Sequence, residues 1–489
     1  MKIFEQIDSF KERVAIESNG KQFTYAYLIE KSELIASFLL NEKKDLKEEK
    51  IGLLMNADIN YICTLWGIWK AGGVAVPLSL SAKKDELKHY ISDCDIKLII
   101  SSNVDQRKQV IPKEKNLVVT DIEEINTKEK KQLPDIKSRR TAMILYTSGT
   151  TSKPKGVVST HKNVESQITT LAKAWEWTQE DHIPLFLPLH HIHGIINSLS
   201  CPLYVGAKVT MMGQFDTEKV CSEVASKDFT VFTAVPTIYF SLIEKLENSQ
   251  NKKLFEGFKK MRLMMSGSAA LAPEIHKKWK ELTGQELLER YGMTEVGMAL
   301  SNKINGERRP GSVGVPLPGV EVKIEDDTGR SIEREQEAGL LLIKGPQVFL
   351  EYLNLPQKTK ESFQDDWFIS GDVVMLEEGY YKILGRDSVD IIKSGGYKIS
   401  ALEIEDILLR NPGIKECAVV GIEDEKWGEI IASGIVLKQK KMGIIEIKDW
   451  CSKHLSNYKI PRNIKILDEL PKNSMGKVTK PKLKKILAN

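Results

Sequence analysis

The segment from Ala142 to Val158, AMILYTSGTTSKPKGVV, constrains the fold more than any other part of the chain. An apolar run typical of a buried strand leads directly into a loop dense in Ser, Thr, Gly and Lys. Small residues let backbone N–H groups approach an anion, hydroxyl groups donate to phosphate oxygens, and lysine adds positive charge. The loop is therefore predicted to hold a polyphosphate. Taken alone, its composition fits a Ser/Thr-rich surface loop with a capping role equally well.

The spacing of this loop excludes one common nucleotide-binding fold. The P-loop requires GxxxxGK followed by Ser or Thr, and the segment does not contain that pattern. A Walker-type fold is therefore disfavoured, and the rest of the chain has to supply the context of the loop.

Length and composition indicate a soluble globular protein of several domains. The chain has 489 residues, 41% hydrophobic and 28% charged, which excludes disordered and fibrous classes. Its net charge is only +4, and lysines alternate with glutamates in stretches such as NEKKDLKEEK, residues 41–50. That pattern is typical of solvated helix faces, so nucleic acid is not an expected partner.

The six cysteines show no CxxC pairing, so neither a zinc site nor a disulfide framework is indicated. The chain contains no apolar run of membrane-spanning length, and its first twenty residues lack the basic-then-apolar order of a signal peptide. We expect no membrane span and a cytoplasmic location, with an organellar location left open.

Hydrophobic patterning predicts alternating strands and helices over the first three hundred residues. Residues 23–40 carry apolar residues at helical spacing, and residues 51–78 read as strand, helix, Gly-marked turn and strand. Further apolar runs indicate strands at 97–102, 116–121, 209–213, 229–235 and 261–269. Such alternation predicts parallel sheets covered by helices.

The pattern of apolar and turn-forming residues changes twice after this region. Short alternating strands with turn residues begin near Gly311, and a helix–strand–loop–strand pattern with a Lys-rich tail follows Arg386. We therefore predict an α/β protein whose large N-terminal domain, 1–386, has two parallel-type sheets with helices and a β-rich subdomain from about 311. A small α+β C-terminal domain, 387–489, completes it.

The loop sequence TSGTTSKPKG, residues 147–156, resembles the phosphate-loop signature of the adenylate-forming superfamily. That superfamily contains acyl-CoA synthetases, peptide-synthetase adenylation domains and luciferases, and its other signatures follow here in order. Most members have Gly where this chain has Ser152. The resemblance implies that the loop binds ATP through the residues Thr147, Ser148, Gly149, Thr150, Thr151 and Lys155.

Two downstream segments resemble the parts of the superfamily that surround the nucleotide. In LERYGMTEVGMALS, residues 288–301, the resemblance implies that Tyr291 stacks on adenine beside Gly292 and that Thr294 bonds the α-phosphate. Glu295 and Thr150 would hold Mg²⁺ as hard oxygen ligands. In SGSAALAP, residues 266–273, the implied nucleotide contacts are Ser268, Ala269 and Ala270. Without the resemblance, residues 288–301 read as a turn followed by a helix N-terminus.

A third group of signatures lies near the predicted domain boundary. FISGD, residues 368–372, with Gly385 and Arg386, resembles the ribose-binding pair, in which Asp372 accepts from both hydroxyls and Arg386 supports it. Residues 387–390 would form the hinge of a rotating C-terminal domain. The chain has one more residue between Arg386 and Lys393 than many relatives, so Asp387 and Asp390 both remain candidates for the hinge. The residues implied to bind coenzyme A are Lys393, Ser394, Gly395 and Gly396.

Near the end, LPKNSMGKVTKPKL places Lys477 where the superfamily has its catalytic lysine. A mobile ammonium group suits the first step, because it can bridge the attacking carboxylate and the α-phosphate as charge builds on phosphorus. Read without the signature, Lys477 is one lysine of a Lys-rich tail.

The acid is indicated by polar residues where the superfamily holds its acyl group. His190, His191 and His193 lie in LPLHHIHG, and Arg290 precedes Tyr291. A buried cation is costly against a fatty tail but suits a second carboxylate, which arginine can bind with two hydrogen bonds. These segments resemble malonyl-CoA synthetases. The resemblance implies that the acid contacts Arg290, Ser266, His191 and Met298, and it counts His191, Thr294, Glu295 and Lys477 as catalytic.

The expected protein is therefore an acid:CoA ligase that uses ATP, Mg²⁺ and coenzyme A, forms an acyl-AMP, and makes a thioester, most simply from malonate or methylmalonate. Its partners would be small molecules, with a monomer or weak homo-oligomer as the assembly. Three alternatives stay open: a ligase for a short fatty or aryl acid, a free-standing adenylation enzyme that loads a carrier protein, and a purely structural Arg290.

Overall fold

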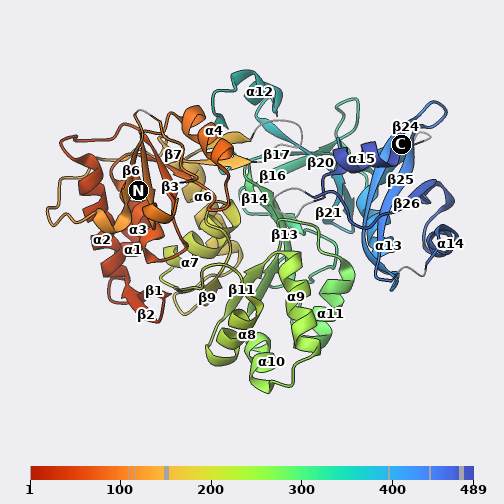
Figure 1. Cartoon of the computed structure of the whole chain (residues 1–489), viewed down its shortest axis with the longest axis horizontal. Helices are drawn as coiled ribbons and strands as arrows, with labels where there is room; N and C mark the ends of the chain where they lie inside the picture. The colour runs from red at the N-terminus through yellow and green to blue at the C-terminus, as the bar shows by residue number, and fades with distance from the viewer. Residues whose placement is uncertain are drawn as a thin grey trace. The chain divides into compact units, whose positions relative to one another are not determined.

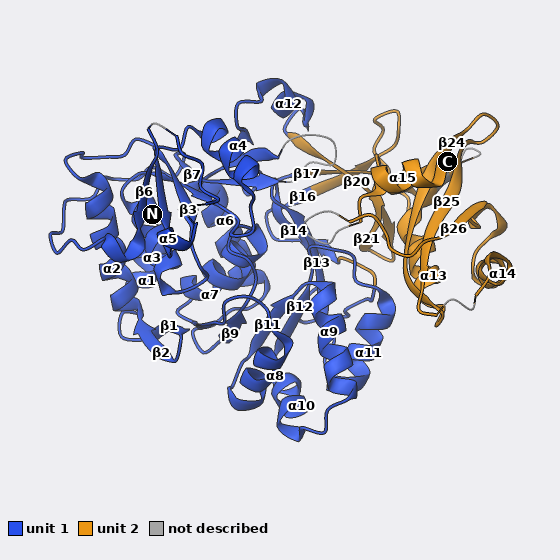
Figure 2. Cartoon of the chain, in the orientation of Figure 1, with its two compact units in different colours: residues 1–310, 314–321, 344–366 blue, residues 311–313, 322–343, 367–489 orange. Residues whose placement is uncertain are grey.

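The computed structural model describes residues 2–107, 109–114, 116–147, 154–394, 397–439, 442–472 and 478–488. The chain forms two compact units (Figure 2). Unit 1 contains residues 1–310, 314–321 and 344–366, and unit 2 contains residues 311–313, 322–343 and 367–489. Figure 1 labels their helices and strands.

A seven-stranded sheet of unit 1 carries the predicted phosphate loop. Its order is β18-β8-β7-β4-β3-β5-β6, and β3 to β7 run parallel while β8 and β18 are antiparallel at one edge. The strands are β3 (Lys50–Leu54), β4 (Val74–Pro77), β5 (Leu98–Ser101), β6 (Val118–Asp121), β7 (Thr141–Thr147), β8 (Lys155–Thr160) and β18 (Glu351–Tyr352). The runs expected at 97–102 and 116–121 are thus confirmed as strands.

Two of the helices that accompany this seven-stranded sheet begin at capping residues in the sequence. Helix α2 (Tyr25–Leu40) begins after Thr24, whose side chain accepts the N–H of Tyr27 at 3.2 Å. Helix α3 (Ile59–Lys70) is capped by Asp58 and buries most of its length, as a helix apolar on all sides must. The other helices here are α1 (Lys2–Asp8), α4 (Lys84–Cys94), α5 (Val104–Arg107), η1 (Ile122–Glu124), α6 (His161–Ala174) and α12 (Pro356–Glu361).

Two further sheets of unit 1 have the orders β2-β1-β10-β9 and β11-β12-β13-β14-β15. The N–H of Thr230, next to β11, donates to the carbonyl of His182 in β9 at 2.9 Å, which joins these two sheets edge to edge. Parallel sheets with helices are therefore confirmed. The strands are β1 (Val14–Ser18), β2 (Lys21–Thr24), β9 (His182–Leu185), β10 (Lys208–Met211), β11 (Val231–Ala234), β12 (Leu263–Ser266), β13 (Leu288–Met293), β14 (Gly297–Ser301) and β15 (Val315–Pro316).

Residues 288–301 form a β-hairpin, which corrects the interpretation of a turn followed by a helix. Leu288 and Glu289 extend the parallel sheet by pairing with Met265 and Ser266 of β12. The chain then turns back, and all five residues of β14 are buried. A buried strand pairs its backbone groups in the sheet, so a helix here would have left the edge of β13 unpaired.

The helices beside these sheets include an unusual one. Residues His193–Ser200 form the π-helix η2, and every residue of it is buried. Such helices are rare and occur frequently at functional sites. The remaining helices are α7 (Cys201–Tyr204), α8 (Thr217–Ser226), α9 (Pro236–Glu247), α10 (Lys252–Lys259) and α11 (Pro273–Thr283).

The described part of unit 2 contains two small sheets, three α-helices and one short 3₁₀ helix. In the first sheet β20 pairs with β17 and β21, and the second has the order β23-β22-β25-β24 with β26 beside β25. The short strand β19 (Phe363–Gln364) belongs to unit 1. The elements of unit 2 are β16 (Glu321–Glu325), β17 (Ala338–Lys344), β20 (Trp367–Glu377), β21 (Tyr380–Arg386), β22 (Ile391–Ser394), β23 (Tyr397–Ser400), α13 (Ala401–Leu409), β24 (Ile414–Asp424), β25 (Gly428–Leu437), α14 (Ile444–His454), η3 (Asn457–Lys459), β26 (Asn463–Ile466) and α15 (Lys480–Ala488).

An ion network in unit 2 holds the predicted hinge segment. Lys480 Nζ lies 2.5 Å from Asp390 Oδ1 and 2.8 Å from Glu405 Oε1, with all three side chains mostly buried. Asp387 instead faces Lys393 across 3.5 Å with both side chains partly exposed. Of the two hinge candidates, Asp390 therefore has the stronger contacts, and the hinge itself stays a prediction.

The six cysteines are all free thiols, five of them buried. Burial raises the pKa of Cys63 and Cys94 to about 12 and that of Cys221 and Cys451 to about 11. The pKa values of Cys201 and Cys417 are also raised by burial. These thiols are therefore packing residues.

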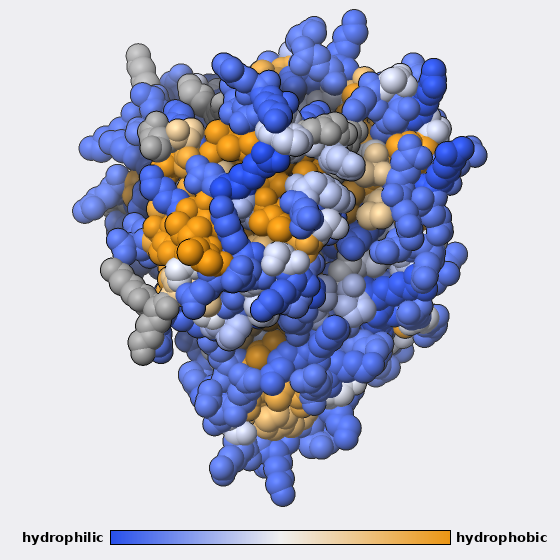
Figure 3. Space-filling view, turned by 90° about the vertical axis from the view of Figure 1, so that its right-hand side faces the viewer, coloured by the Kyte–Doolittle hydropathy of each residue, from blue (hydrophilic) through white to orange (hydrophobic). Residues whose placement is uncertain are grey.

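One face of the molecule is largely hydrophilic, with apolar side chains gathered over part of it (Figure 3). The large apolar side chains that unit 2 exposes are Tyr397, Leu409, Ile444, Ile445, Tyr458, Ile466 and Ile486. Within the described ranges, no helix has the length and apolar character needed to cross a bilayer.

Candidate active site

The two ends of the predicted phosphate loop are held opposite each other. Thr147 ends β7, Lys155 begins β8, and the two are cross-strand partners in the antiparallel pair. Both side chains are half-buried. The other predicted loop residues, Ser148, Gly149, Thr150 and Thr151, lie outside the described residues.

Glu295, the predicted magnesium ligand, is connected to this loop by Tyr352. Glu295 is 5% exposed, and the Tyr352 hydroxyl donates to its Oε1 at 2.8 Å. Lys155 Nζ lies 4.5 Å from the centroid of the Tyr352 ring. Strand β18 places Tyr352 there by pairing it with Val157 of β8. A cation, an aromatic ring and a carboxylate are thus brought together from three separate segments.

Sequence reasoning missed Tyr352. It lies in a two-residue strand within LEYLNLP, which has no recognisable motif, and it is separated from Glu295 by 57 residues. A lone tyrosine between apolar residues usually indicates a core position, and only the strand pairing shows its polar contact.

Arg290, the predicted acid-binding residue, is buried on β13. Ser266 pairs with Glu289 across β12 and β13, so Arg290 follows at the next position. Arg290 is 3% exposed, and burial lowers its pKa to about 10. Among the described residues, none is a hydrogen-bond partner for its three guanidinium nitrogens or for Ser266 Oγ.

The contacts of neighbouring residues argue against a purely structural Arg290. Glu289, its expected pairing partner in that case, has Oε1 3.4 Å from His276 Nδ1. Successive strand residues point to opposite faces, which separates Glu289 from Arg290. Gly267 lies directly against Arg290, since a Cβ at Gly267 would stand 2.4 Å from Nη1. A buried cation in such a setting is costly unless it pairs with an anion.

The three histidines of the predicted acyl wall differ in environment. His191 is exposed and its ring stands 4.2 Å from that of His190, whose pKa burial lowers to about 3. His193 is buried, with Nδ1 3.0 Å from Ser268 Oγ and Nε2 2.8 Å from Thr233 Oγ1. Burial and the nearby charge of Arg290 hold the pKa of His193 well below its usual value. His193 is therefore neutral at physiological pH.

The remaining predicted residues of unit 1 lie in the loop after β12 and in the β13–β14 hairpin. Ser268, Ala269 and Ala270 are exposed in that loop, while Tyr291, Gly292 and Thr294 are half-buried at the end of β13 and in the turn after it. Met298 is buried on β14, where it pairs with Gly292, and a Cβ at Gly292 would stand 2.6 Å from Met298 Cε.

The predicted ribose pair lies within unit 2. Asp372 and Arg386 are cross-strand partners on β20 and β21, and Arg386 Nε is 2.9 Å from Asp372 Oδ1. Arg386 Nη1 also donates to the carbonyl of Ser370 at 2.8 Å. Of the predicted coenzyme A residues, Lys393 is exposed and Ser394 is buried on β22. Gly395, Gly396 and the predicted catalytic Lys477 lie outside the described residues.

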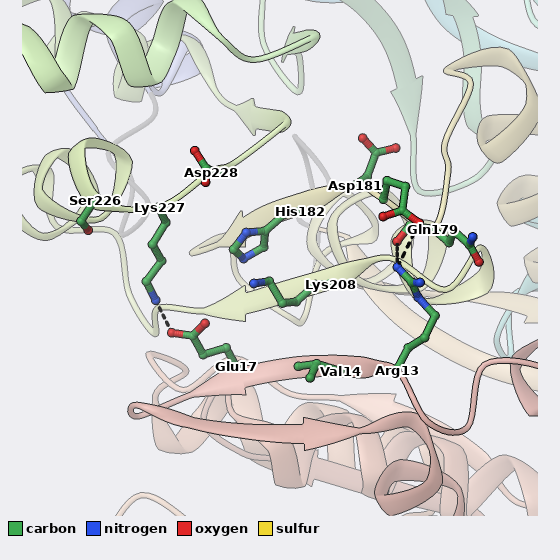
Figure 4. Close-up of a pocket in the computed structure, with 11 residues that line it drawn as sticks. Arg13, Val14, Glu17, Gln179, Asp181, His182, Lys208, Ser226, Lys227 and Asp228 are labelled. Atoms are coloured by element: carbon green, nitrogen blue, oxygen red, sulfur yellow. Dashed lines mark hydrogen bonds and ion pairs between the residues drawn. The ribbon is translucent and has the colours of Figure 1, made fainter.

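A hollow of about 540 Å³ lies elsewhere in unit 1, between β1, β9, β10 and the end of α8 (Figure 4). Its charged residues are largely paired with one another or with the backbone. Lys227 pairs with Glu17, and Arg13 donates to the carbonyl of Gln179 at 2.5 Å. Asp181 is bound by Arg262 at 2.6 Å. Because most of these charges are already paired and none of the predicted site residues lines the hollow, it does not compete with the Arg290 region as a substrate site.

Comparison with known proteins gives the family. Residues 3–353 match the model of the AMP-binding enzyme family, and residues 403–477 match that of the AMP-binding enzyme C-terminal domain. The chain belongs to the AMP-binding enzyme family. The predicted membership of the adenylate-forming superfamily is thereby confirmed, as is the predicted fold of a large N-terminal part with a smaller C-terminal one.

Relatives of this AMP-binding enzyme match over almost its full length. The mitochondrial malonate–CoA ligase of Bos taurus is 39% identical, covering 98% of this chain and 89% of the relative. The malonate–CoA ligase of Arabidopsis thaliana is also 39% identical, covering 99% and 88%. The crystal structure of ATP-bound MatB from Rhodopseudomonas palustris is 30% identical with a TM-score of 0.89, covering 99% of this chain and 97% of that one.

Proposed function

We propose that this AMP-binding enzyme is a malonate–CoA ligase that converts malonate, ATP and coenzyme A into malonyl-CoA, AMP and pyrophosphate. The observation that carries the proposal is the buried guanidinium of Arg290, which has no protein partner among the described residues and lies against Gly267. The two malonate–CoA ligases above, similar over nearly the whole chain, support the same substrate.

The acid pocket follows from the chemistry of Arg290. One carboxylate of malonate would take two hydrogen bonds from the guanidinium, with Ser266 Oγ as a further donor. The second carboxylate is then free to react. His193 adds no charge, because it is neutral in this environment. A single buried cation therefore matches an acid with one additional carboxylate and disfavours a fatty or aryl acid, whose tail would leave Arg290 unpaired.

The nucleotide contacts implied by the family resemblance come from several separate segments of the chain. Thr147 and Lys155, with the loop between them, would bind the phosphates, and Tyr291 would stack on adenine beside residues Ser268 to Ala270. Asp372 would accept from the ribose hydroxyls, since Arg386 fixes its carboxylate by contact with Oδ1. Neither a serine nor a cysteine nucleophile is required, because the acyl-AMP is itself the activated acyl donor.

The residues present fit a magnesium ion brought in with ATP. Within the described ranges, no group of three or more His, Cys, Asp or Glu could hold a metal, but Mg²⁺ is commonly bound by one or two carboxylates together with substrate phosphates. Glu295 would supply the carboxylate and Thr150 the hydroxyl. When bound, Mg²⁺ would neutralise phosphate charge. Tyr352 orients Glu295 for this role by donating to Oε1.

The two chemical steps call on different residues of the C-terminal part. In the first, Lys477 would neutralise charge as a malonate oxygen attacks the α-phosphorus and pyrophosphate leaves. In the second, Lys393 to Gly396 would line the path of the coenzyme A thiol, which attacks the acyl carbon and expels AMP. Rotation about residues 387–390 would exchange these groups, and such conformational steps often limit turnover.

Location and assembly are carried over from the sequence as predictions. A cytoplasmic location and a monomeric or weakly associated state remain expected. An organellar location also remains open, because the relative from Bos taurus is named as mitochondrial.

The experiment that tests the proposed function is a competition among acids. The protein is incubated with ATP, Mg²⁺, coenzyme A and an equimolar mixture of malonate, methylmalonate, acetate, octanoate and 4-coumarate, and the thioesters are identified by mass spectrometry. We expect malonyl-CoA to dominate. Dominance of octanoyl-CoA or coumaroyl-CoA would contradict the assigned acid, and absence of any thioester, with acyl-AMP still formed, would favour carrier loading.

Replacing Tyr352 with Phe isolates the contact to Glu295. The ring beneath Lys155 is retained, while the hydroxyl that orients the buried carboxylate is lost. Hydrogen bonds to charged groups contribute about 1.5–3 kcal/mol, so we expect kcat/KM for ATP to fall by at least about tenfold and half-maximal activity to need more Mg²⁺. Steady-state kinetics against ATP and Mg²⁺ measure both. The matched control is Tyr397→Phe at an exposed position, and equal kinetics for the two variants would contradict the role of Tyr352.

A further inference from the structure

Ser268 has a backbone conformation that a residue with a side chain rarely adopts. Its φ is +69°, in the left-handed region. The glycine of this segment is Gly267, one position earlier, whereas the residue with positive φ, Ser268, carries a side chain. Left-handed conformations of non-glycine residues persist when their surroundings hold them, and they cluster at functional sites. A contact with the surrounding structure is therefore expected to hold Ser268 in this conformation.

That contact comes from His193. Nδ1 of His193 is 3.0 Å from Ser268 Oγ, and Nε2 is 2.8 Å from Thr233 Oγ1. A neutral imidazole has one N–H donor and one acceptor nitrogen, and a hydroxyl group can fill either role. Burial beside Arg290 keeps the ring neutral. Both of its nitrogens are thus used by protein hydroxyls, and neither is left for the acid.

The chain of contacts connects the sheet to the two substrates. Thr233 lies on β11 and pairs with Met265 of β12, which fixes one end of the His193 ring to the sheet. At the other end Ser268 opens the predicted nucleotide segment, and Gly267, the residue before it, lies against the guanidinium of Arg290. A change in φ at Ser268 would therefore move residues 268–270 and would also shift Gly267 relative to the guanidinium of Arg290.

We propose that His193 is a positioning residue that holds Ser268 in its left-handed conformation. It thereby fixes the position of residues 268–270, the predicted nucleotide segment, relative to Arg290. This inference rests on the proposed function, since it takes residues 268–270 as nucleotide contacts and Arg290 as the acid contact. It differs from the role expected from the sequence, in which His193 lined the acyl wall. His193 acts on substrate binding through Ser268 and not by its own charge.

Two pairs of variants test this role. In His193→Asn the amide stands where Nδ1 was and can still bond Ser268, whereas in His193→Gln it stands where Nε2 was and can bond only Thr233. In Ser268→Gly the left-handed φ costs nothing, whereas Ser268→Ala keeps the conformational conflict and loses the hydroxyl. We expect kcat/KM of His193→Asn to exceed that of His193→Gln by about tenfold, which is the effect of losing one hydrogen bond. We expect the same ratio between Ser268→Gly and Ser268→Ala.

The double variant supplies the decisive readout. If His193 acts through Ser268, adding His193→Gln to Ser268→Gly causes little further loss, and the KM values for ATP and for the acid rise together in the single His193→Gln variant. Equal losses in Asn and Gln, with full additivity in the double variant, would overturn the proposal and leave His193 as a core residue. If both His193 variants unfold, the two variants at the exposed Ser268 still test the proposal. Equal activity of Ser268→Gly and Ser268→Ala would overturn it.

The assay separates this inference from the proposed function. Each variant is measured with the acid that the wild-type protein uses best in the competition experiment. If that acid is not malonate, the assigned substrate fails while the order of the variants still tests His193. If malonate is used and the order is absent, the role of His193 fails alone.

Discussion

Replacing Arg290 with Met is expected to lower kcat/KM for malonate by about a thousandfold and to raise the melting temperature. Truncating one partner of a buried, hydrogen-bonded charge pair costs about 2–5 kcal/mol or more in binding, which gives the size of the first effect. The second follows because the guanidinium has no partner among the described residues, so an apolar side chain of similar length removes an unpaired buried charge. Activity and stability would thus change in opposite directions.

Arg308 offers the matched control. Burial also lowers its pKa, but its Nη1 donates to the carbonyl of Glu286 at 2.6 Å and its Nη2 to that of Ile304 at 3.4 Å. Arg308→Met should lower the melting temperature and leave the preference for malonate unchanged.

Kinetics with malonate, acetate and octanoate, together with differential scanning calorimetry, measure both effects. An equal loss for all three acids in Arg290→Met would reject the selective role of Arg290. A lower melting temperature in that variant would show that the arginine stabilises the fold.

The second large effect is expected from Lys477→Ala. Removal of one group that stabilises charge in a transition state typically costs about 10²- to 10³-fold in kcat, and we expect pyrophosphate release to fall by at least that factor. ATP binding, measured by calorimetry, should change by only a few fold, because the lysine acts on charge that develops during the attack. Thioester formation from supplied malonyl-AMP should be retained.

Lys472 is the matched control in the same tail. Its Nζ is 2.6 Å from Glu416 Oε2 in a partly exposed ion pair, and such pairs contribute about 0–1 kcal/mol. Lys472→Ala should therefore release pyrophosphate at the wild-type rate. If Lys477→Ala did the same, the lysine would have no part in the first step.

The sequence predicted the parts of the site that lie within short contiguous segments. Thr147 and Lys155 flank one loop, and the pairing of β12 with β13 sets Ser266 beside Glu289, the residue before Arg290. Apolar runs between helices were enough to place the parallel strands, because strands buried on both faces are mostly apolar along their whole length. The family signatures then identified the site to which these strands belong.

The contacts that could not be predicted join segments far apart in the chain. Ser268 is 75 residues from His193, and Thr233 is 40 residues from it, with no pattern in the sequence linking the three. The π-helix was not foreseen, since HGIINSLS has no feature that separates a π-helix from an α-helix. The composition change near Gly311 coincides with the first residues of unit 2, whereas the hinge at 387–390 remains a prediction.

The buried cysteines make the protein convenient for site-specific labelling. A thiol with a pKa of about 11 is ionised in only about one molecule in ten thousand at pH 7, so maleimide dyes would react slowly with the native thiols. A cysteine introduced at Ile445 on α14, a position 77% exposed, would react far faster. Movements of the C-terminal region during turnover could then be followed by fluorescence without first replacing the six native cysteines.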